Sequence, residues 1–387
     1  MDATCIANGR GYGRFARELI AAMAERSPAD EFVLFVDDRA AATWTGTTSN
    51  TRLALVPQRV SPTIAAAADS SRSPGDMLRF TRAVWRAKLD VFFSPSVYTY
   101  FPLPPHLAAV VTLHDAIAER FPEMTLPSRR ARLFWNLKTR LALMQAKLVL
   151  TVSEFAASEI VAVHGLSRDR VRVASEAPSS VYRPSECAAD IEAVARKYGL
   201  RDGERWFVYV GGFNPHKHVD VIVRAHAAAI RGAEHPPHLV LVGTRDSDVF
   251  HGDSQRIADA IRQCGTTELV QWTGFVPDEE LRHLLSGAIA LLLPSESEGF
   301  GLPAIEAAAC GTPVIATTAS PLPDLLTDGG YFVKPGDEQD TARAMIALMT
   351  DENDRVTRGA RAREGAGRLS WTAAADVALS ALREAAA

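Results

Sequence analysis

The strongest constraint on the fold is a regular alternation of short apolar runs with longer amphipathic stretches. Helix-like stretches such as residues 76–88 and 128–146 separate many of the apolar runs. Strands that alternate with helices favour a parallel sheet covered on both faces. The strand pattern restarts after residues 179–190, which predicts two α/β domains. The expected strands are 32–36, 52–56, 91–94, 109–113, 148–152, 171–173, 206–210, 238–242, 269–272, 289–293 and 313–316.

The composition limits the classes of partner. The 387 residues are 47% hydrophobic, which is enough for two cores, and the net charge of -4 excludes nucleic acid as a main partner. The four cysteines have no paired spacing, so we expect reduced thiols in a cytoplasmic protein. No apolar stretch is long enough to span a bilayer, and no signal peptide is expected.

The stretch from Ser295 to Pro323 is the most informative part of the chain. It reads SESEGFGLPAIEAAACGTPVIATTASPLP and follows the apolar run 289–293. A loop is expected up to Gly301, and Pro303 then marks the first turn of a helix. The backbone N–H groups of Phe300, Gly301 and Leu302 belong to a helix start, where they favour an anion or a hydroxyl group.

Glu298 and Glu306 flank this helix start with seven residues between them. Carboxylates accept hydrogen bonds from neighbouring hydroxyls, which suits the ribose and the hexose of a nucleotide sugar. Taken alone, the two acids are better explained as a solvated loop residue and a first-turn acid that the helix dipole favours.

The whole string resembles the motif of the retaining glycosyltransferases of family 4. The resemblance implies a GT-B fold, in which two Rossmann-like domains with parallel sheets face each other across a cleft and a C-terminal helix crosses back to the first domain. The expected domains are residues 1–184 on the acceptor side, residues 185–369 for the nucleotide sugar and residues 370–387 for the crossing helix. The resemblance is strong from about Trp206 to Gly336 and covers the rest more weakly.

The N-terminus departs from the family pattern. Only MDATCI precedes a glycine-rich loop, so most of the first strand is expected to be missing or very short, as a late start of the chain would produce. Gly11 and Gly13 belong to this loop, for which a tight turn is the alternative explanation. The resemblance implies that both glycines lie close to the donor's diphosphate, where a backbone without side chains is needed.

His114 is the candidate catalytic residue of the first domain. It follows the apolar run 109–113, and ligands of parallel sheets bind at the carboxyl ends of strands. The resemblance implies that it lies near the transferred sugar, although a histidine at a strand end is often structural. Asp115 either orients this histidine or caps the next segment.

Lys217 is the candidate phosphate ligand of the second domain. It follows the strand 206–210 and lies near the start of a helix, where a phosphate is favoured. The resemblance implies that it holds the diphosphate, together with the loop that contains Gly212. The family often has arginine at the positions of Gly212 and His216, so here we expect one permanent cation and one titratable cation.

The segment Ser128–Lys147 carries arginines and lysines but no acid, with large apolar residues interleaved. Such a helix either lies on an anionic membrane, which suits a lipid-linked acceptor, or packs one face in the core and exposes a basic face. We expect the second arrangement.

No cofactor is expected. Asp246 and Asp248 could bind a divalent metal, but two loop carboxylates supply too few ligands, so a metal-independent reaction is expected. The resemblance implies transfer of a hexose to a glycan or lipid-linked hydroxyl, with catalysis by His114, Lys217 and Glu298 and with mannose from GDP-mannose as the first expectation. A disaccharide phosphorylase or epimerase, and a silent nucleotide-sugar-binding partner subunit, are the alternatives.

Overall fold

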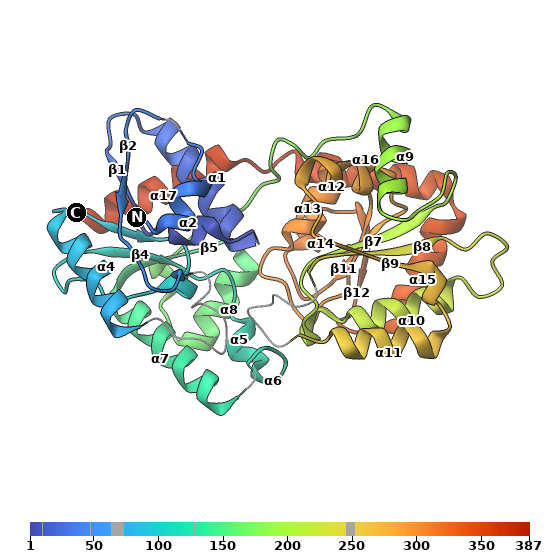
Figure 1. Cartoon of the computed structure of the whole chain (residues 1–387), viewed down its shortest axis with the longest axis horizontal. Helices are drawn as coiled ribbons and strands as arrows, with labels where there is room; N and C mark the ends of the chain where they lie inside the picture. Colours follow the sequence, from blue (N-terminus) through green and yellow to red (C-terminus); the bar gives the residue numbers. More distant parts are fainter. Residues whose placement is uncertain (10, 47, 63–72, 127, 245–251) are drawn as a thin grey trace. The chain divides into compact units, whose positions relative to one another are not determined.

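The computed structural model describes residues 1–387 except residues 10, 47, 63–72, 127 and 245–251. The chain divides into two compact units. Unit 1 contains Met1–Glu176 and Ser370–Ala387, and unit 2 contains Ala177–Leu369. Each unit has a parallel sheet with helices (Figure 1), so the predicted α/β architecture is confirmed. The chain leaves unit 1 eight residues before the expected boundary at residue 184.

Unit 1 contains six named strands in two parallel groups, β1-β2 and β3-β4-β5-β6. The elements of unit 1 are η1 (Thr4–Ala7), α1 (Gly11–Arg26), β1 (Phe32–Val36), α2 (Asp38–Thr43), β2 (Thr51–Leu55), α4 (Pro74–Arg86), β3 (Phe92–Ser94), η2 (Val97–Thr99), β4 (Ala109–Thr112), α5 (Ile117–Arg120), α6 (Pro122–Thr125), α7 (Arg129–Gln145), β5 (Ala146–Thr151), α8 (Glu154–His164), η3 (Arg168–Arg170), β6 (Val171–Val173) and α17 (Trp371–Ala386).

The first three residues act as a very short strand that joins the two groups. Ala3 N donates to Phe35 O at 2.9 Å and Phe35 N donates to Met1 O at 2.9 Å, so this segment pairs with β1. On its other side, Asp2 N donates to Phe93 O of β3 at 2.9 Å. The chain then continues first to β1 and β2 on one side and later to β3 on the other. The glycine loop therefore follows the strand at which the order of the sheet reverses.

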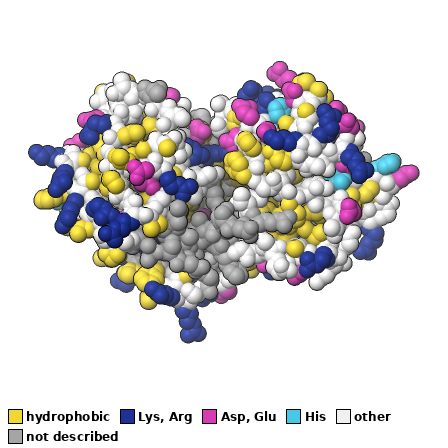
Figure 2. Space-filling view, in the orientation of Figure 1, with side chains coloured by type: hydrophobic (Ala, Val, Ile, Leu, Met, Phe, Trp, Pro, Cys, Tyr) yellow, Lys and Arg dark blue, Asp and Glu magenta, His cyan; other side chains and the backbone are white. Residues whose placement is uncertain are grey.

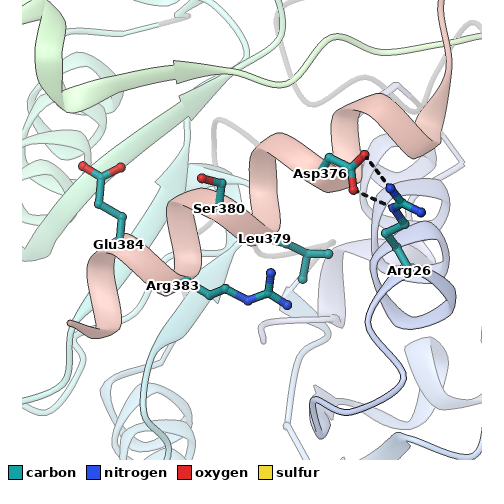
Figure 3. A pocket seen from close by; sticks show the side chains of 6 residues that line it. All are labelled: Arg26, Asp376, Leu379, Ser380, Arg383 and Glu384. Carbon is teal, nitrogen blue, oxygen red and sulfur yellow. Dashed lines mark hydrogen bonds and ion pairs between the residues drawn. The ribbon is translucent and has the colours of Figure 1, made fainter.

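Helix α17 completes unit 1 by packing against α1. Its buried face consists mainly of alanines, including Ala374, Ala378 and Ala381, which allow two helices to approach closely. Figure 3 shows the end of this contact, where Arg26 Nε lies 2.7 Å from Asp376 Oδ1 beside a cavity of about 570 Å³. Both charged side chains are about half exposed, so the apolar packing contributes more than this ion pair.

Unit 2 has one six-stranded parallel sheet in the order β12-β11-β10-β7-β8-β9. In Figure 1, α10 and α11 lie on one side of this sheet, and α12, α13 and α16 lie on the other. The elements of unit 2 are α9 (Ala188–Lys197), β7 (Trp206–Val210), η4 (Pro215–Lys217), α10 (Val219–Ala229), β8 (His238–Val242), α11 (Ser254–Cys264), η5 (Thr267–Leu269), β9 (Val270–Gly274), α12 (Asp278–Gly287), β10 (Leu291–Leu293), α13 (Leu302–Ala309), β11 (Val314–Thr317), α14 (Leu322–Leu325), β12 (Gly330–Val333), α15 (Glu338–Thr350) and α16 (Glu352–Ala366).

Within the described ranges, no helix combines the length and the apolar character needed to cross a membrane.

The two glycines at the start of α1 have different surroundings. A Cβ added to Gly13 would lie 2.0 Å from Asn8 O, whereas a Cβ on Gly11 would meet no heavy atom within 4 Å. We expect Gly13→Ala to lower the free energy of unfolding by about 2 kcal/mol, because a backbone oxygen cannot move aside easily. Gly11→Ala is the matched control and should change it by less than about 1 kcal/mol. Urea denaturation measures both, and equal effects would contradict the structural role of Gly13.

Candidate functional site

The candidate site of unit 2 lies where the strand order of its sheet reverses. From β7 the chain proceeds to β8 and β9 on one side, and then returns to β10 on the other side of β7. The carboxyl ends of β7 and β10 therefore lie next to each other, which is where open α/β sheets bind ligands. The loops 211–218 and 294–301 follow these two strands and carry Lys217 and Glu298.

An ion pair connects the two loops. Lys217 Nζ lies 2.7 Å from Glu298 Oε1, and the same oxygen accepts a hydrogen bond from Ser295 Oγ at 2.6 Å. The lysine side chain is 19% exposed and the glutamate side chain is 9% exposed, so solvent reaches the cation more than the anion. One ammonium hydrogen serves Glu298, and the ammonium of lysine has two more to offer an anionic ligand.

The loop after β10 is held by further contacts that the sequence did not predict. Glu296 N donates to His216 O at 2.7 Å, and Glu296 Oε2 lies 2.9 Å from His218 Nε2. Glu298 N donates to Ala319 O at 3.0 Å. The repeated Ser-Glu pattern was the only local signal for this arrangement, in which the side chains of Glu296 and Glu298 bind neighbouring residues of the β7 loop.

Helix α13 begins with the geometry that the motif requires. Gly301 is the N-cap and has a φ of 86°, in the left-handed region that glycine favours. A Cβ at this position would also lie 2.8 Å from Leu322 Cδ1. Pro303 occupies the first turn, and the amide of Leu302 lies at a position without an acceptor inside the helix. Phe300 is buried, at 4% exposure.

Glu306 lies in the second turn of α13 and is 4% exposed. A carboxylate this deeply buried has to be hydrogen-bonded or paired. Its location on the helix that starts at Gly301 agrees with the predicted position, and its role toward a ribose stays a prediction.

The loop after β7 contains Gly212, His216 and Lys217. His216 is not a titratable cation near neutral pH, because burial and the neighbouring Lys217 and His218 hold its pKa well below the usual value. That expectation was wrong, and Lys217 is the permanent cation of this loop. Lys217 ends a 3-10 turn and His218 caps α10, so the lysine lies just before the helix. Gly212 O accepts a hydrogen bond from Tyr209 Oη.

His114 occupies the expected place in unit 1, directly after β4. Its Nε2 lies 3.0 Å from Pro95 O, and since a carbonyl only accepts, Nε2 carries the hydrogen. Its Nδ1 lies 3.7 Å from the buried carboxylate of Glu176, which the sequence did not single out. Asp115 caps the next helix by accepting from Ile117 N at 2.9 Å. A sugar hydroxyl that binds His114 would therefore approach Nδ1.

The glycine loop and His114 lie close together within unit 1. The ring of Phe15, two residues after Gly13, packs edge-on against the ring of His114 with centroids 4.8 Å apart. Gly11 and Gly13 both lie in the first turn of α1. The structure thus brings together the predicted residues of unit 1, and separately Lys217, Glu298 and the start of α13 in unit 2. The donor roles of these residues stay predictions.

No group of three or more His, Cys, Asp or Glu side chains suited to a metal occurs among the described residues, and the four cysteines are free within them. Asp246 and Asp248 lie outside the described residues.

Two family models match the chain. The model for "Glycosyl transferases group 1" matches residues 190–365, and the model for "Glycosyltransferase Family 4" matches residues 9–176. These two segments contain the sites of unit 2 and unit 1, respectively.

Individual proteins are similar over much of the chain. The O-antigen chain mannosyltransferase B of Escherichia coli is 30% identical over 283 residues, which cover 73% of this chain and 71% of that protein. A D-inositol 3-phosphate glycosyltransferase of Kribbella flavida is 31% identical over 61% of this chain, but only 56% of that protein is matched. The structure of a sucrose-phosphate synthase from Thermosynechococcus elongatus superposes with a TM-score of 0.73 at 21% identity, over 97% of this chain and 93% of that one.

The ion pair between Lys217 and Glu298 can be tested on the protein without ligand. Lys217→Met and Glu298→Gln should each destabilise it, because each leaves a mostly buried charge without its partner. The double variant should be more stable than the sum of the two effects predicts, with a coupling of about 1–2 kcal/mol. Urea denaturation of the four proteins measures this coupling. Additive effects would contradict a stabilising pair.

Proposed function

The chain belongs to the group 1 and family 4 glycosyltransferases and has their GT-B fold, and on that premise we propose that it transfers a hexose from a nucleoside diphosphate to an acceptor hydroxyl with retention at the anomeric carbon. The observation that carries the proposal is the cluster of Lys217, Glu298 and Ser295 beside the start of α13. It combines a permanent cation, a carboxylate and helix N–H groups at the edge of the sheet where ligands bind.

Each group of the cluster has a distinct role in this proposal. As the bond from the anomeric carbon to the diphosphate breaks, negative charge develops on the leaving oxygen, and Lys217 with the start of α13 stabilises that charge. The acceptor oxygen bonds to the same face of the sugar, and its proton passes to the departing phosphate oxygen. Glu298 orients the hexose by accepting from its hydroxyls. No metal takes part in this scheme.

Glu306 and the loop around Gly301 hold the nucleoside. Glu306 accepts from the ribose diol, and Phe300, Gly301 and Leu302 line the phosphate side of the helix start. In unit 2, the proposed role of Gly212 is close approach of its backbone to the diphosphate. The roles of His114, Gly11 and Gly13 toward the donor stay predictions from the family resemblance.

Mannose from GDP-mannose is the first donor to test, because the E. coli relative is named a mannosyltransferase. The relatives named for D-inositol 3-phosphate keep other donors and a phosphorylated acceptor open. The proposed acceptor is a glycan or a lipid-linked glycan, and the proposed location is the cytoplasm, with peripheral contact to the inner face of the membrane.

A panel of nucleotides tests the donor site directly. Thermal unfolding is measured with GDP, UDP, ADP and dTDP, each with and without a chelator. A nucleotide at a hundred times its dissociation constant should add about 2.7 kcal/mol of stability, and we expect this for one base regardless of chelator. No shift with any nucleotide would contradict the donor site, and a shift that chelator abolishes would contradict the metal-free scheme.

The role of Glu306 gives a graded prediction. Glu306→Gln retains one acceptor oxygen and should weaken binding of the preferred nucleotide about tenfold, and Glu306→Ala should weaken it about a hundredfold, since hydrogen bonds to a charged group are worth about 1.5–3 kcal/mol. Calorimetric titration measures both. Glu352→Ala removes an exposed acid of α16 and serves as the control for charge. Wild-type affinity in both Glu306 variants would exclude the ribose contact.

A further inference from the structure

Helix α7 exposes an apolar stripe that nothing in the described part of unit 1 covers. Five large side chains are between 38% and 71% exposed, and at about 100° per residue they fall within about 100° of one another around the helix axis. They are Leu133, Phe134, Leu137, Leu141 and Met144. The face that packs on unit 1 uses Ala131, Thr139, Ala142 and Leu143 instead. The segment thus packs one face in the core, as expected, but its exposed side carries large apolar residues in addition to the basic ones.

The charges that α7 itself carries have one sign. Residues 128–147 contain no acid, although the whole chain carries a net charge of -4. Arg129, Arg130 and Arg140 are exposed, and the Arg130 guanidinium lies over the ring of Phe134 at 5.4 Å from its centroid. Figure 2 shows hydrophobic and basic side chains mixed at the lower left, where α7 lies in Figure 1.

A cavity of about 750 Å³ adjoins the apolar stripe. Arg132, Arg140 and Met144 line it from α7, and Arg170 lines it from η3. Glu119 is the acid of this cavity, and it accepts from Trp135 Nε1 at 2.7 Å. Burial raises the pKa of Glu119 to about 7, so its charge is reduced near neutral pH and opposes an anion only weakly. Arg132 lies 3.6 Å from Glu123, and Arg170 donates to Leu143 O and Ala146 O, so the cavity offers a group of headgroup size Arg140 and the remaining N–H groups of these two arginines.

We propose that α7 is the surface by which this protein docks on an anionic lipid membrane. The apolar stripe enters the boundary of the acyl chains, the arginines contact lipid phosphates, and the cavity accepts one headgroup. Charge complementarity selects this occupant, because the basic side chains of α7 outnumber the one neighbouring exposed acid that pairs with them, Glu123, and attract anionic lipids. An apolar stripe between basic residues is typical of helices that lie in the interface. The inference deepens the proposed lipid-linked acceptor and places the membrane at unit 1.

The test is co-sedimentation of the full chain with vesicles of phosphatidylcholine alone and with one-quarter phosphatidylglycerol, without any nucleotide sugar. The wild-type protein should bind the anionic vesicles at least about tenfold better, and high salt should weaken this binding. Leu133→Ser/Leu137→Ser should lower the binding at least about tenfold. Val356→Ser, at an equally exposed apolar position of unit 2, is the matched control and should bind as the wild type does.

Tryptophan fluorescence gives two further readouts of membrane contact. In Leu137→Trp, tryptophan fluorescence should shift to the blue with anionic vesicles and be quenched by brominated lipid. Equal binding to neutral and anionic vesicles, unchanged binding of the serine variant, or no fluorescence change would overturn the proposal. So would a wild-type dimer that the serine variant loses while neither protein binds vesicles. The serine variant should keep the wild-type thermal shift with nucleotide, so failure of membrane docking is distinguishable from failure of the proposed transferase function.

Discussion

The contact between Lys217 and Glu298 joins two loops that are far apart in the chain and adjacent in the sheet. Its 2.7 Å separation and partial burial mean that both charges are compensated before any ligand arrives. Under the proposed function, a diphosphate that reaches Lys217 shares the ammonium with Glu298 rather than meeting a solvated lysine. The contact with Glu298 therefore offsets much of the free-energy cost of removing the Lys217 ammonium from water. The cation is then already in place for the negative charge that develops during the reaction.

The parts of the fold that local sequence determines were predictable. Strands buried on both faces are continuous apolar runs, and residues 32–36, 206–210 and 238–242 match β1, β7 and β8 without error. The short edge strand β6 also has the expected bounds, residues 171–173. Ser153 and Ser370 are the N-caps of α8 and α17, and serine before a helical stretch is a local signal of this kind. The strand β12 was missed because it is short, lies at the edge of the sheet and begins with Gly330, where a side chain would strike Val314 O.

What could not be predicted depends on contacts between distant segments. The low pKa of His216 follows from burial beneath the β10 loop, which its neighbours in sequence do not reveal. Glu176 approaches His114 because the chain returns to this edge of the sheet after β6. The exposed stripe of α7 is the opposite case. Its composition was evident, but which face would pack on unit 1 depended on the small residues Ala131 and Ala142.

Because α17 belongs to unit 1, the two units become complete at different stages of synthesis. Unit 2 is one continuous segment, so all of its strands are available once residue 369 has left the ribosome. Unit 1 is begun before unit 2 but completed after it, because the alanine face that packs on α1 belongs to α17, which follows unit 2 in the chain. Until then Phe15 of α1, which is fully buried in the finished protein, lacks the ring of Trp371, whose centroid lies 6.1 Å from its own. Unit 2 can thus fold as soon as its own residues have been synthesised. Unit 1 stays incomplete for longer and exposes apolar surface to which a chaperone can bind.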